Sequence, residues 1–546
     1  MKKQLLETGA ATLLVALGLA GCGSSSSQSS NGGDTAKNQT INWMQSANLI
    51  TLDPSKCIDV NSATALGNVD QGLLKDPDGK GVVPAVAKSY SVSKDGKTYT
   101  FKLRHSKWSN GDPVTARDFV YGFQRTVNPK TASQDAYLYD HVENYAAIQS
   151  KKMAPTKLGV SAPNNYTLVV KLSKPQSYFK YLVTAPAFLP QNEKVVNKYG
   201  KKYGTNSASQ VYNGPFKATG WTGTNDTWSL VKNDKYWDKS SVKLQRVNMH
   251  VVKDDQTGLN EFQTGKLDEL SLNGKQQVEH FKNDPGYREN KTVYSNFIEL
   301  NQDKVPAFKN LKIRKALSMA VNREQFVKDV LGDGSTPTKG FVGNDLAYHN
   351  GKDFADVAYV KSATEYNLAE AKKLWKAGMK ELGLKSLNLT LTYDDTDSAK
   401  STTEFLQSNF QKLPGLKVTN VNLPRQQRIA RLFSGKFDMC VSGWDPSFPD
   451  PVAALSIKKS DSSLNFSKWK NSKFDAYLDK SENQDANNPD KRWNDLVQAE
   501  KVYANDQGNI PFYQNTAPVV MKTNIKGLSY NPSASTAWDF SKAYVK

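Results

Sequence analysis

Apolar and polar residues alternate in several short stretches of the chain, and this period of two predicts half-buried β-strands. Tyr99, Phe101 and Leu103 form one such set, directly after a turn expected at Asp95 and Gly96. Other stretches of strand character lie over residues 41–44, 166–172, 228–230, 387–393, 439–441 and 510–513.

A period of 3.6 residues in other segments predicts amphipathic helices. Thr115, with Asp118 three residues later, predicts a capping box at the start of one helix. Further helices are predicted over residues 313–323, 368–382, 426–433 and 493–506. Because helices and strands mix without an internal repeat, the pattern favours α/β or α+β lobes.

The chain is long enough, at 546 residues, for two or three lobes with substantial cores. Its formal net charge of +19 raises the question of nucleic-acid binding. Basic residues alternate with acidic ones, as in residues 232–235 and 479–482, and form no long run. The charge therefore indicates a solvated basic surface, and we expect no nucleic-acid partner.

The first residues of the chain indicate export. A basic start precedes an apolar run over residues 10–20 that is too short to span a membrane. The run ends in Leu-Ala-Gly-Cys at residues 19–22, which resembles the lipobox of bacterial lipoproteins. The resemblance implies a signal peptide over residues 1–21 and a lipid on Cys22; a plain secretory signal with an incidental cysteine is the alternative. Residues 22–37, rich in small and polar residues, predict a flexible tether.

Few residues suggest catalysis or metal binding. The five histidines are scattered, and the sequence contains no zinc-binding or nucleophile motif. We interpret Cys57 and Cys440 as single buried thiols. Asp394, Asp395 and Asp397 could be paired carboxylates of a hydrolase, but acids in a polar loop are more often solvated. We therefore expect no enzyme activity, no cofactor and no metal site.

The stretch 437–451 combines several features of a ligand site. Its first half predicts a short strand, after which Gly443 brings the backbone into the open and Trp444 offers a large flat face. The loop that follows contains Asp445, Ser447, Asp450 and three prolines. We interpret the stretch as one wall of a ligand site; a buried strand whose loop only closes the sheet is the alternative.

Several further segments accompany this stretch in a fixed order. They are residues 96–104, 108–119, 213–216, 236–237, 313–317, 322–323 and 437–444. Each segment alone is weakly specific, but together, behind a lipobox and from about residue 43 to the C-terminus, they are highly specific. The chain resembles the extracytoplasmic oligopeptide-binding lipoproteins of peptide-type ABC importers, the family 5 solute-binding proteins.

The resemblance implies an α/β fold with two lobes, periplasmic-binding-protein-like of type II, cluster C, with an extra domain and closure about a hinge. Domain I is expected to combine residues 38–74, 207–295 and 511–546. Domain II is expected over residues 75–206 and domain III over residues 296–510.

The resemblance also implies a function. A lipid-anchored receptor, monomeric and on the outer face of the bacterial cytoplasmic membrane, would capture extended oligopeptides between its lobes. It would deliver them to the membrane permease and ATPase subunits of an ABC importer. Backbone pairing would supply affinity, and hydrated pockets would tolerate many side chains. A dipeptide, peptide-pheromone, nickel or haem receptor of the same fold stays open, as does a surface adhesin or folding helper.

The site residues follow from the same resemblance. Gly443 and Trp444 would bond the peptide backbone from one side, and Asp59, Val60, Asn61 and Ser62 from the other. Family members commonly hold the peptide's α-ammonium with an aspartate where this chain has Ser447, which cannot supply a charge-assisted bond.

Two further hypotheses concern charged groups near this site. Asp445 or Asp450 could replace the missing aspartate, and we favour Asp445. Arg428 and Arg431, one helical turn apart, are candidates for the peptide carboxylate. A solvated basic face is the alternative for these two arginines.

Overall fold

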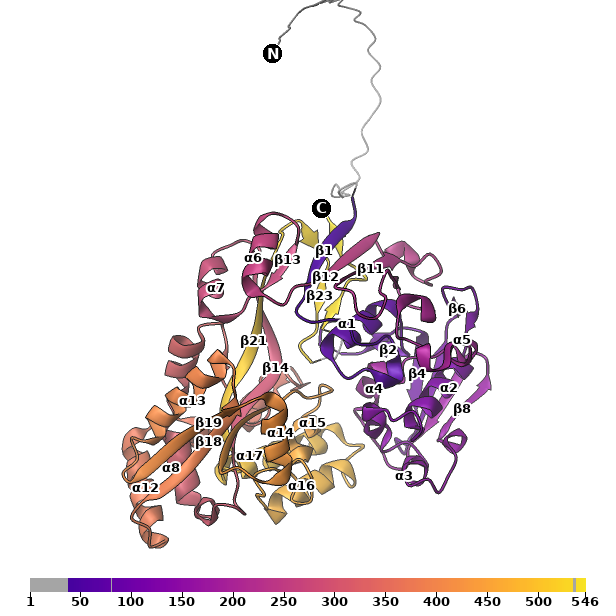
Figure 1. Ribbon diagram of the computed structural model, residues 1–546. Helices are drawn as coiled ribbons and strands as arrows, with labels where there is room; N and C mark the ends of the chain where they lie inside the picture. The colour runs from indigo at the N-terminus through magenta and orange to yellow at the C-terminus, as the bar shows by residue number, and fades with distance from the viewer. Residues whose placement is uncertain (1–37, 80, 534–536) are drawn as a thin grey trace, which may run out of the picture.

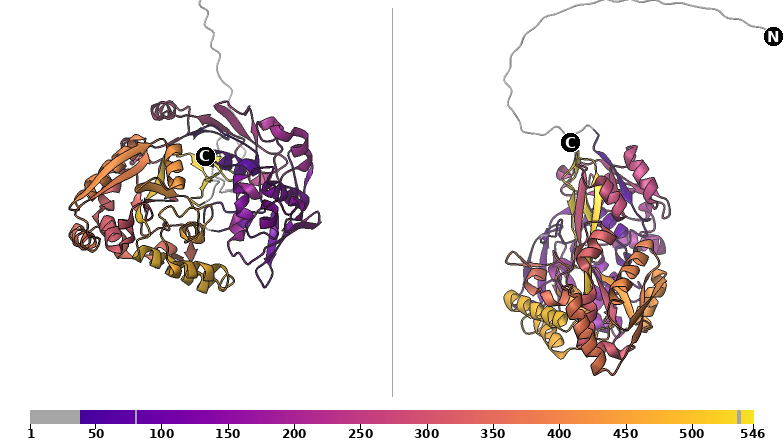
Figure 2. Two further views of the ribbon diagram at one scale, coloured as in Figure 1. Left: turned by 60° about the horizontal axis from the view of Figure 1, so that its bottom comes forward. Right: turned by 90° about the vertical axis from the view of Figure 1, so that its left-hand side faces the viewer.

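A computed structural model of the protein describes residues 38–79, 81–533 and 537–546. The expected signal peptide and tether, with Cys22, lie outside the described residues. Figure 1 shows two lobes joined at the top of the view, and the lobes are again distinct in the left-hand view of Figure 2. In the part of the chain that the structure describes, no helix combines the length and the apolar character needed to cross a membrane.

The upper part of the molecule contains a four-stranded sheet with the order β1-β12-β11-β10. Ile41 and Trp43 of β1 are buried, which confirms the strand predicted there. β1 pairs in parallel with β12, which lies about two hundred residues later, so the sheet joins distant parts of the chain. The strands are β1 (Thr40–Gln45), β10 (Phe216–Thr219), β11 (Thr227–Lys232) and β12 (Arg246–Val251).

The right-hand lobe of Figure 1 contains a second four-stranded sheet with the order β4-β5-β9-β8. Tyr99, Phe101 and Leu103 of β5 are buried on one face, as their alternation predicts. Gly96, in the turn before β5, has a φ of 72°, a conformation that favours glycine. The strands are β4 (Ala87–Val92), β5 (Thr98–Leu103), β8 (Val160–Asn164) and β9 (Thr167–Lys171).

The predicted capping box starts α2 (Ala116–Val127), which packs on this sheet. The Thr115 backbone N–H donates to the Asp118 carboxylate at 2.7 Å, which confirms the prediction. The other helices up to residue 281 are α1 (Val60–Val69), α3 (Tyr145–Gln149), α4 (Phe179–Leu182), α5 (Glu193–Tyr199), α6 (Asp255–Gln263) and α7 (Gly274–Phe281), of which α6 and α7 lie at the upper left of Figure 1.

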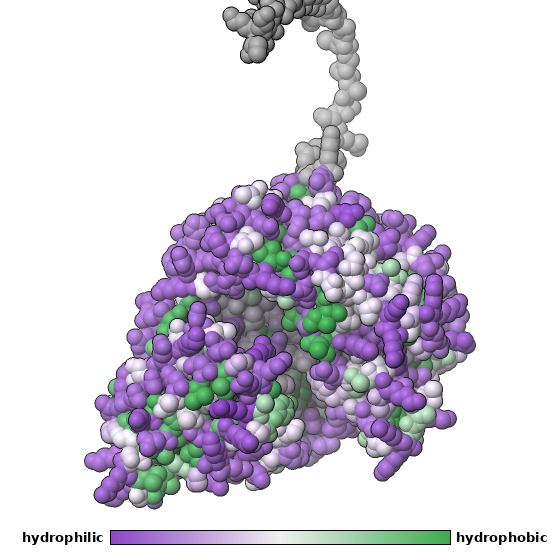
Figure 3. All heavy atoms as spheres, in the orientation of Figure 1, coloured by the Kyte–Doolittle hydropathy of each residue, from purple (hydrophilic) through white to green (hydrophobic). Residues whose placement is uncertain are grey.

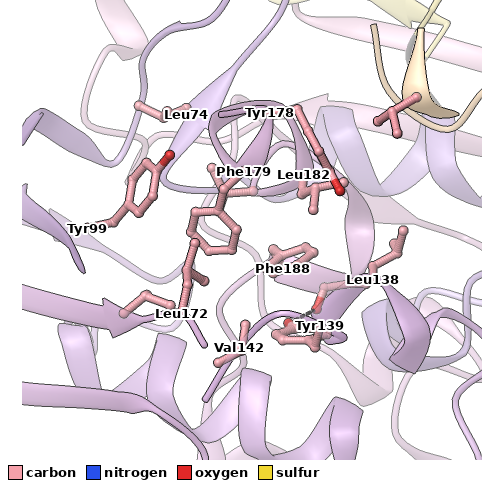
Figure 4. Packing of buried hydrophobic residues seen from close by; sticks show 14 of the residues in the cluster. Leu74, Tyr99, Leu138, Tyr139, Val142, Leu172, Tyr178, Phe179, Leu182 and Phe188 are labelled. Atoms are coloured by element: carbon pink, nitrogen blue, oxygen red, sulfur yellow. Dashed lines mark hydrogen bonds between the residues drawn. The ribbon is translucent and has the colours of Figure 1, made fainter. Parts of the chain in front are cut away.

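Aromatic side chains fill the core of this lobe (Figure 4). Tyr139 stacks on Phe188 with ring centroids 4.1 Å apart, and its hydroxyl donates to the Ala187 carbonyl at 2.7 Å. Such an aromatic pair contributes roughly 0.5–1.5 kcal/mol beyond the burial of its area. The core therefore fixes the short helical segments that carry one wall of the cleft.

A seven-stranded sheet forms the centre of the left-hand lobe, with the path β13-β21-β14-β20-β18-β19 and β15 beside β21. Two of its strands, β14 and β21, are long and run up toward the junction of the lobes (Figure 1). The strands are β13 (Glu269–Ser271), β14 (Tyr287–Leu300), β15 (Thr336–Pro337), β18 (Leu387–Asp394), β19 (Leu416–Leu423), β20 (Met439–Trp444) and β21 (Ile510–Met521).

The two long strands cross the expected boundaries between domains I and III. β14 contains both residues 295 and 296, and β21 contains both residues 510 and 511. Their pairing shifts register between Lys291 and Ser295, so the ladder is interrupted near its middle. The domain boundaries themselves stay predictions.

Helices surround the large sheet, and one of them ends earlier than predicted. The helix predicted over residues 313–323 stops at Ala320, because Val321 turns to extended backbone and Asn322 caps the next helix. The helices are α8 (Leu311–Ala320), α9 (Arg323–Gln325), α10 (Phe354–Ala358), α11 (Lys361–Thr364), α12 (Leu368–Glu381), α13 (Asp397–Phe410), α14 (Arg425–Ser434), α15 (Val452–Leu455), α16 (Ser472–Glu482) and α17 (Pro489–Asn505).

A buried ion pair ties the N-terminal segment to α2. Both carboxylate oxygens of Asp53 accept from the Arg125 guanidinium, at 2.6 and 2.7 Å. Gln191 accepts a further bond from Arg125 at 2.8 Å. Because Asp53 is buried and Arg125 mostly so, losing one partner leaves the other charge without compensation.

We expect Asp53→Asn to lower the free energy of unfolding by about 3 kcal/mol, since it leaves the Arg125 charge unpaired. Urea unfolding followed by tryptophan fluorescence measures this loss. Glu370→Gln is the control, because its partner Lys373 is highly exposed and the pair contributes less than about 1 kcal/mol. Equal losses in the two variants would contradict the structural role given to Asp53.

Candidate ligand-binding cleft

A hollow lies between the two lobes, with apolar surface gathered on its right-hand rim (Figure 3). Three cavities at this interface are lined by residues of both lobes, and Ser447 contributes to the wall of all three. The loop after β20 therefore lies at the centre of the cleft. This agrees with the interpretation of the stretch 437–451 as a wall of a ligand site.

Strand β20 is paired unequally on its two edges. One edge pairs with β14 along its whole length, from Met439 to Trp444. The other edge pairs with β18 only at Met439 and Cys440. Within the described residues, no strand pairs with this edge from Val441 to Trp444. Gly443 and Trp444, the partly exposed residues of this edge, thus offer backbone groups that an added strand could pair with.

Gly443 and Trp444 are held in place by neighbouring side chains. A Cβ atom built on Gly443 would lie 2.2 Å from the Tyr294 hydroxyl oxygen, so the tyrosine packs directly against this glycine. The Trp444 indole N–H donates to the Ala453 carbonyl at 2.8 Å. Both residues are partly exposed, which leaves room for ligand contact.

Asp450 is engaged within the left-hand lobe. Its two carboxylate oxygens accept from the Arg492 guanidinium at 2.8 Å each, and Asp450 is buried. This pairing leaves Asp450 without a free oxygen edge for a ligand ammonium. Of the two replacements considered for the missing aspartate, Asp445 is the one that faces the cleft.

An acidic cavity of about 210 Å³ lies next to Ser447. Asp59, Asp135 and Asp445 line it, and none of the described residues in its wall is basic. We call it the acidic cavity. Asp59 and Asp135 come from the right-hand side of the cleft and Asp445 from the left, so three carboxylates converge from both lobes.

The acidic cavity disfavours the ionised form of two of its carboxylates. Solvent reaches Asp135 and Asp445, but the surrounding protein removes part of their hydration, which raises the pKa of each to about 6. A cation placed here would favour the ionised forms. Asp135 was not predicted, because a lone aspartate in a short helical segment, here Gln134–Tyr139, carries no sequence signal.

Asp59, which lines the same cavity, has one carboxylate oxygen without a partner among the described residues. Its Oδ1 accepts from the Ser62 backbone N–H at 2.9 Å and so caps α1. Its Oδ2 is buried, and within the described residues it has no hydrogen-bond partner. A buried carboxylate oxygen without a partner is costly, and a ligand donor would remove that cost.

The three residues after Asp59 were also predicted to contact the peptide, and they divide into two groups. Val60 is exposed on the wall of the acidic cavity, and the Asn61 side chain donates to a nearby backbone carbonyl at 3.2 Å. Ser62 is buried, and its Oγ accepts from the Thr51 N–H at 3.2 Å. The N–H and the hydroxyl oxygen of Ser62 both bond within the lobe, and its contact with a ligand stays a prediction.

The two candidate arginines lie on α14, the basic helix that the sequence predicts. Arg428 is buried, and its Nε donates to Asp394 at 2.6 Å. The Arg428 guanidinium is therefore hydrogen-bonded to Asp394, and Arg428 does not lie on a solvated face. Arg431 is partly exposed and stays a prediction.

Side chains meet across the mouth of the cleft. Phe448 stacks on Tyr178 with ring centroids 4.7 Å apart and planes 5° from parallel. Lys174 lies 3.5 Å from Glu482, and the Tyr137 hydroxyl lies 3.5 Å from Ser447 Oγ. These contacts join the two lobes directly, in addition to β14 and β21.

The cysteines of the described residues do not lie in a disulfide. Cys57 and Cys440 are free and buried, as predicted, and burial raises the pKa of each thiol to about 12. Among the residues that the structure describes, no group of three or more histidine, cysteine, aspartate or glutamate side chains is arranged to hold a metal ion.

Comparisons with known proteins agree with this architecture. Residues 81–466 match the family described as "Bacterial extracellular solute-binding proteins, family 5 Middle". A dipeptide-binding protein of Lactococcus lactis is 35% identical over 562 aligned residues, which cover 100% of both chains. The oligopeptide-binding protein OppA of Bacillus subtilis is 30% identical and covers 98% of both chains.

Solved structures show the same similarity. The structure of Listeria monocytogenes OppA bound to peptide matches with a TM-score of 0.76 and 36% identity, over 94% of this chain and 100% of that chain. The expected α/β fold with two lobes is thereby confirmed. This chain belongs to the family 5 bacterial extracellular solute-binding proteins.

Proposed function

We propose that this protein is a receptor that binds extended peptides between its lobes and delivers them to an ABC importer. The observation that carries the proposal is the open edge of β20, which ends beside three converging carboxylates. An open strand edge suits a peptide main chain, and carboxylates suit its ammonium group. The peptide-binding names of the relatives support the same assignment.

The acidic cavity takes the α-ammonium of the peptide. Asp445 and Asp135 contribute charge from opposite lobes, and Asp59 contributes its unpartnered oxygen. A bound ammonium neutralises carboxylates that the protein alone holds at a raised pKa. This arrangement replaces the single aspartate that the family commonly carries where this chain has Ser447.

The peptide main chain then pairs with β20 at Gly443 and Trp444. Main-chain pairing supplies affinity that does not depend on side-chain identity. The packing of Tyr294 against Gly443 keeps this edge in position, since both strands belong to one sheet. Val60 and Asn61 approach from the opposite wall of the cleft.

Delivery requires closure of the lobes and a membrane location. Closure changes the outer surface of the receptor, which the permease and ATPase subunits of an importer can read. The lipobox-like sequence at residues 19–22 supports a lipid on Cys22 and a position on the outer face of the cytoplasmic membrane. We further infer that the protein is a monomeric receptor without catalytic activity.

Peptide binding predicts a rise in the midpoint of thermal unfolding. We would unfold and refold the mature domain to remove bound ligand, then add peptide pools of two to about ten residues. A ligand that binds only the folded state stabilises it by roughly RT ln(1 + [L]/Kd), so pools of suitable length raise the midpoint.

Nickel chloride, haem and buffer are the comparison arms of this experiment. A rise with nickel or haem and with no peptide pool would contradict peptide reception in favour of another ligand class. No rise with any addition would favour an adhesin or a folding helper.

The acidic cavity predicts that peptide affinity falls as the pH drops through 6. The pKa of Asp135 and of Asp445 is raised to about 6, so below that pH both carboxyls are increasingly neutral and cannot pair with an ammonium. Isothermal titration calorimetry should show roughly tenfold weaker binding at pH 5 than at pH 7.5.

Asp445→Asn and Asp135→Asn should each weaken binding by roughly tenfold or more at pH 7.5, since each removes a charge-assisted bond. Asp397→Asn, at a fully exposed position on α13, is the matched control. N-acetylated peptides should show little dependence on pH or on either variant. Unchanged affinity in both cavity variants would contradict the assignment of the ammonium to this cavity.

A further inference from the structure

A second cavity, of about 590 Å³, lies between the lobes on the other side of Ser447. Its volume falls within the range of roughly 300–1,000 Å³ that is typical of small-molecule sites. Large apolar side chains of both lobes line it, and we call it the apolar cavity. They are Tyr137, Leu138, Tyr178 and Leu182 from one lobe and Trp444, Phe448, Val452, Ile457 and Leu464 from the other.

The right-hand wall of the apolar cavity belongs to a rigid core. Figure 4 shows Leu138, Tyr178 and Leu182 on one side of the packed aromatic cluster that contains Phe179 and Phe188. Tyr178 also stacks on Phe448 of the opposite lobe. The cavity is therefore complete only while the lobes stand close together.

Charged groups at the rim of the apolar cavity are already paired with one another. His141 Nδ1 lies 2.9 Å from an Asp140 carboxylate oxygen, and Lys174 lies 3.5 Å from Glu482. Asp140 and Glu482 thus each have a partner within the protein, and the apolar side chains of the wall are what the cavity offers to a ligand. The interior suits an apolar group, which gains by leaving water.

The apolar cavity and the acidic cavity are neighbours along the chain and in space. Trp444 lines the first and Asp445 the second, and Ser447 lines both. On the opposite wall, Tyr137 lines the first and Asp135 the second. The Tyr137 hydroxyl lies 3.5 Å from Ser447 Oγ, and the two cavities meet at this contact.

We propose that the apolar cavity selects peptides whose first or second residue has a large apolar side chain. The inference rests on the proposed function, because the ammonium in the acidic cavity fixes the amino end of the peptide beside the apolar one. It departs from the side-chain tolerance that the family resemblance implies. The occupant is the side chain of a leucine, phenylalanine or similar residue.

An apolar side chain in this cavity also favours the closed arrangement of the lobes. It contacts residues of both lobes at once, as the stacked Tyr178 and Phe448 do. Burial of a leucine or phenylalanine side chain corresponds to at least roughly tenfold in affinity. Selection and closure therefore have the same physical origin, the removal of apolar surface from water between the lobes.

The test uses tetra-alanine and its variants with leucine, phenylalanine or aspartate at each position in turn, titrated into the mature domain by calorimetry. We expect leucine or phenylalanine at position one or two to raise affinity by roughly tenfold or more over tetra-alanine. We expect the same residues at position four to have little effect, and aspartate at positions one and two to lower affinity.

A pair of variants separates this cavity from the rest of the cleft. Ser456→Trp fills the cavity from an exposed position in its wall. Ser463→Trp places the same side chain at an exposed position nearby that does not line the cavity. Ser456→Trp should abolish the advantage of leucine and phenylalanine while leaving tetra-alanine binding unchanged, and Ser463→Trp should change neither.

Two outcomes would overturn the inference in distinguishable ways. Equal affinity for all the peptides, or an apolar advantage that Ser456→Trp preserves, would refute the apolar cavity as a selector and leave peptide reception standing. No binding of any peptide would refute the proposed function and the inference with it. Unfolding midpoints equal to that of the parent protein show that both variants are folded.

Discussion

The pairing of β14 with its neighbours is the constraint on which the rest of the structure depends. β14 runs through the junction of the lobes with β21 on one side, and with β20 on the other side at its far end. Ser295, at the edge of the register shift, pairs with Trp444. The cleft wall is thus hydrogen-bonded to the strand that joins the lobes. Under the proposed function, a ligand that pairs with the end of β20 therefore lies next to the irregular part of the β14 ladder.

Local charge in the cleft is opposite to the charge of the whole protein. The chain has a formal net charge of +19, yet the cavity beside Ser447 is lined by three aspartates and no basic side chain among the described residues. Asp450, by contrast, is paired with Arg492 within the left-hand lobe. The net charge of the chain therefore bears on its solubility and its surroundings. The charge of the acidic cavity bears on the ligand that we propose for it.

Local features of the fold could be predicted from the sequence because they depend on neighbouring residues. The alternation of Tyr99, Phe101 and Leu103 gave β5, and the spacing of Thr115 and Asp118 gave the start of α2. The end of α8 was missed, because its apolar period continues past Ala320 while the backbone does not.

The site could be predicted only in part, since its members come from distant segments. Tyr137 and Ser447 are 310 residues apart, and no local pattern indicates that they meet. The engagement of Arg428 by Asp394 and of Asp450 by Arg492 likewise depends on tertiary packing. Family resemblance located the loop after β20, but the partners that decide which carboxylates are free came from the three-dimensional structure.

A crystal structure of the mature domain with a leucine-containing tetrapeptide tests the central claim most directly. The account predicts the peptide ammonium at hydrogen-bond distance, about 3 Å, from Asp445 or Asp135. It also predicts main-chain hydrogen bonds between the peptide and the open edge of β20 at Gly443 and Trp444. A peptide bound in the reverse direction, with its carboxylate toward Ser447, or one without contact to β20, would contradict the account.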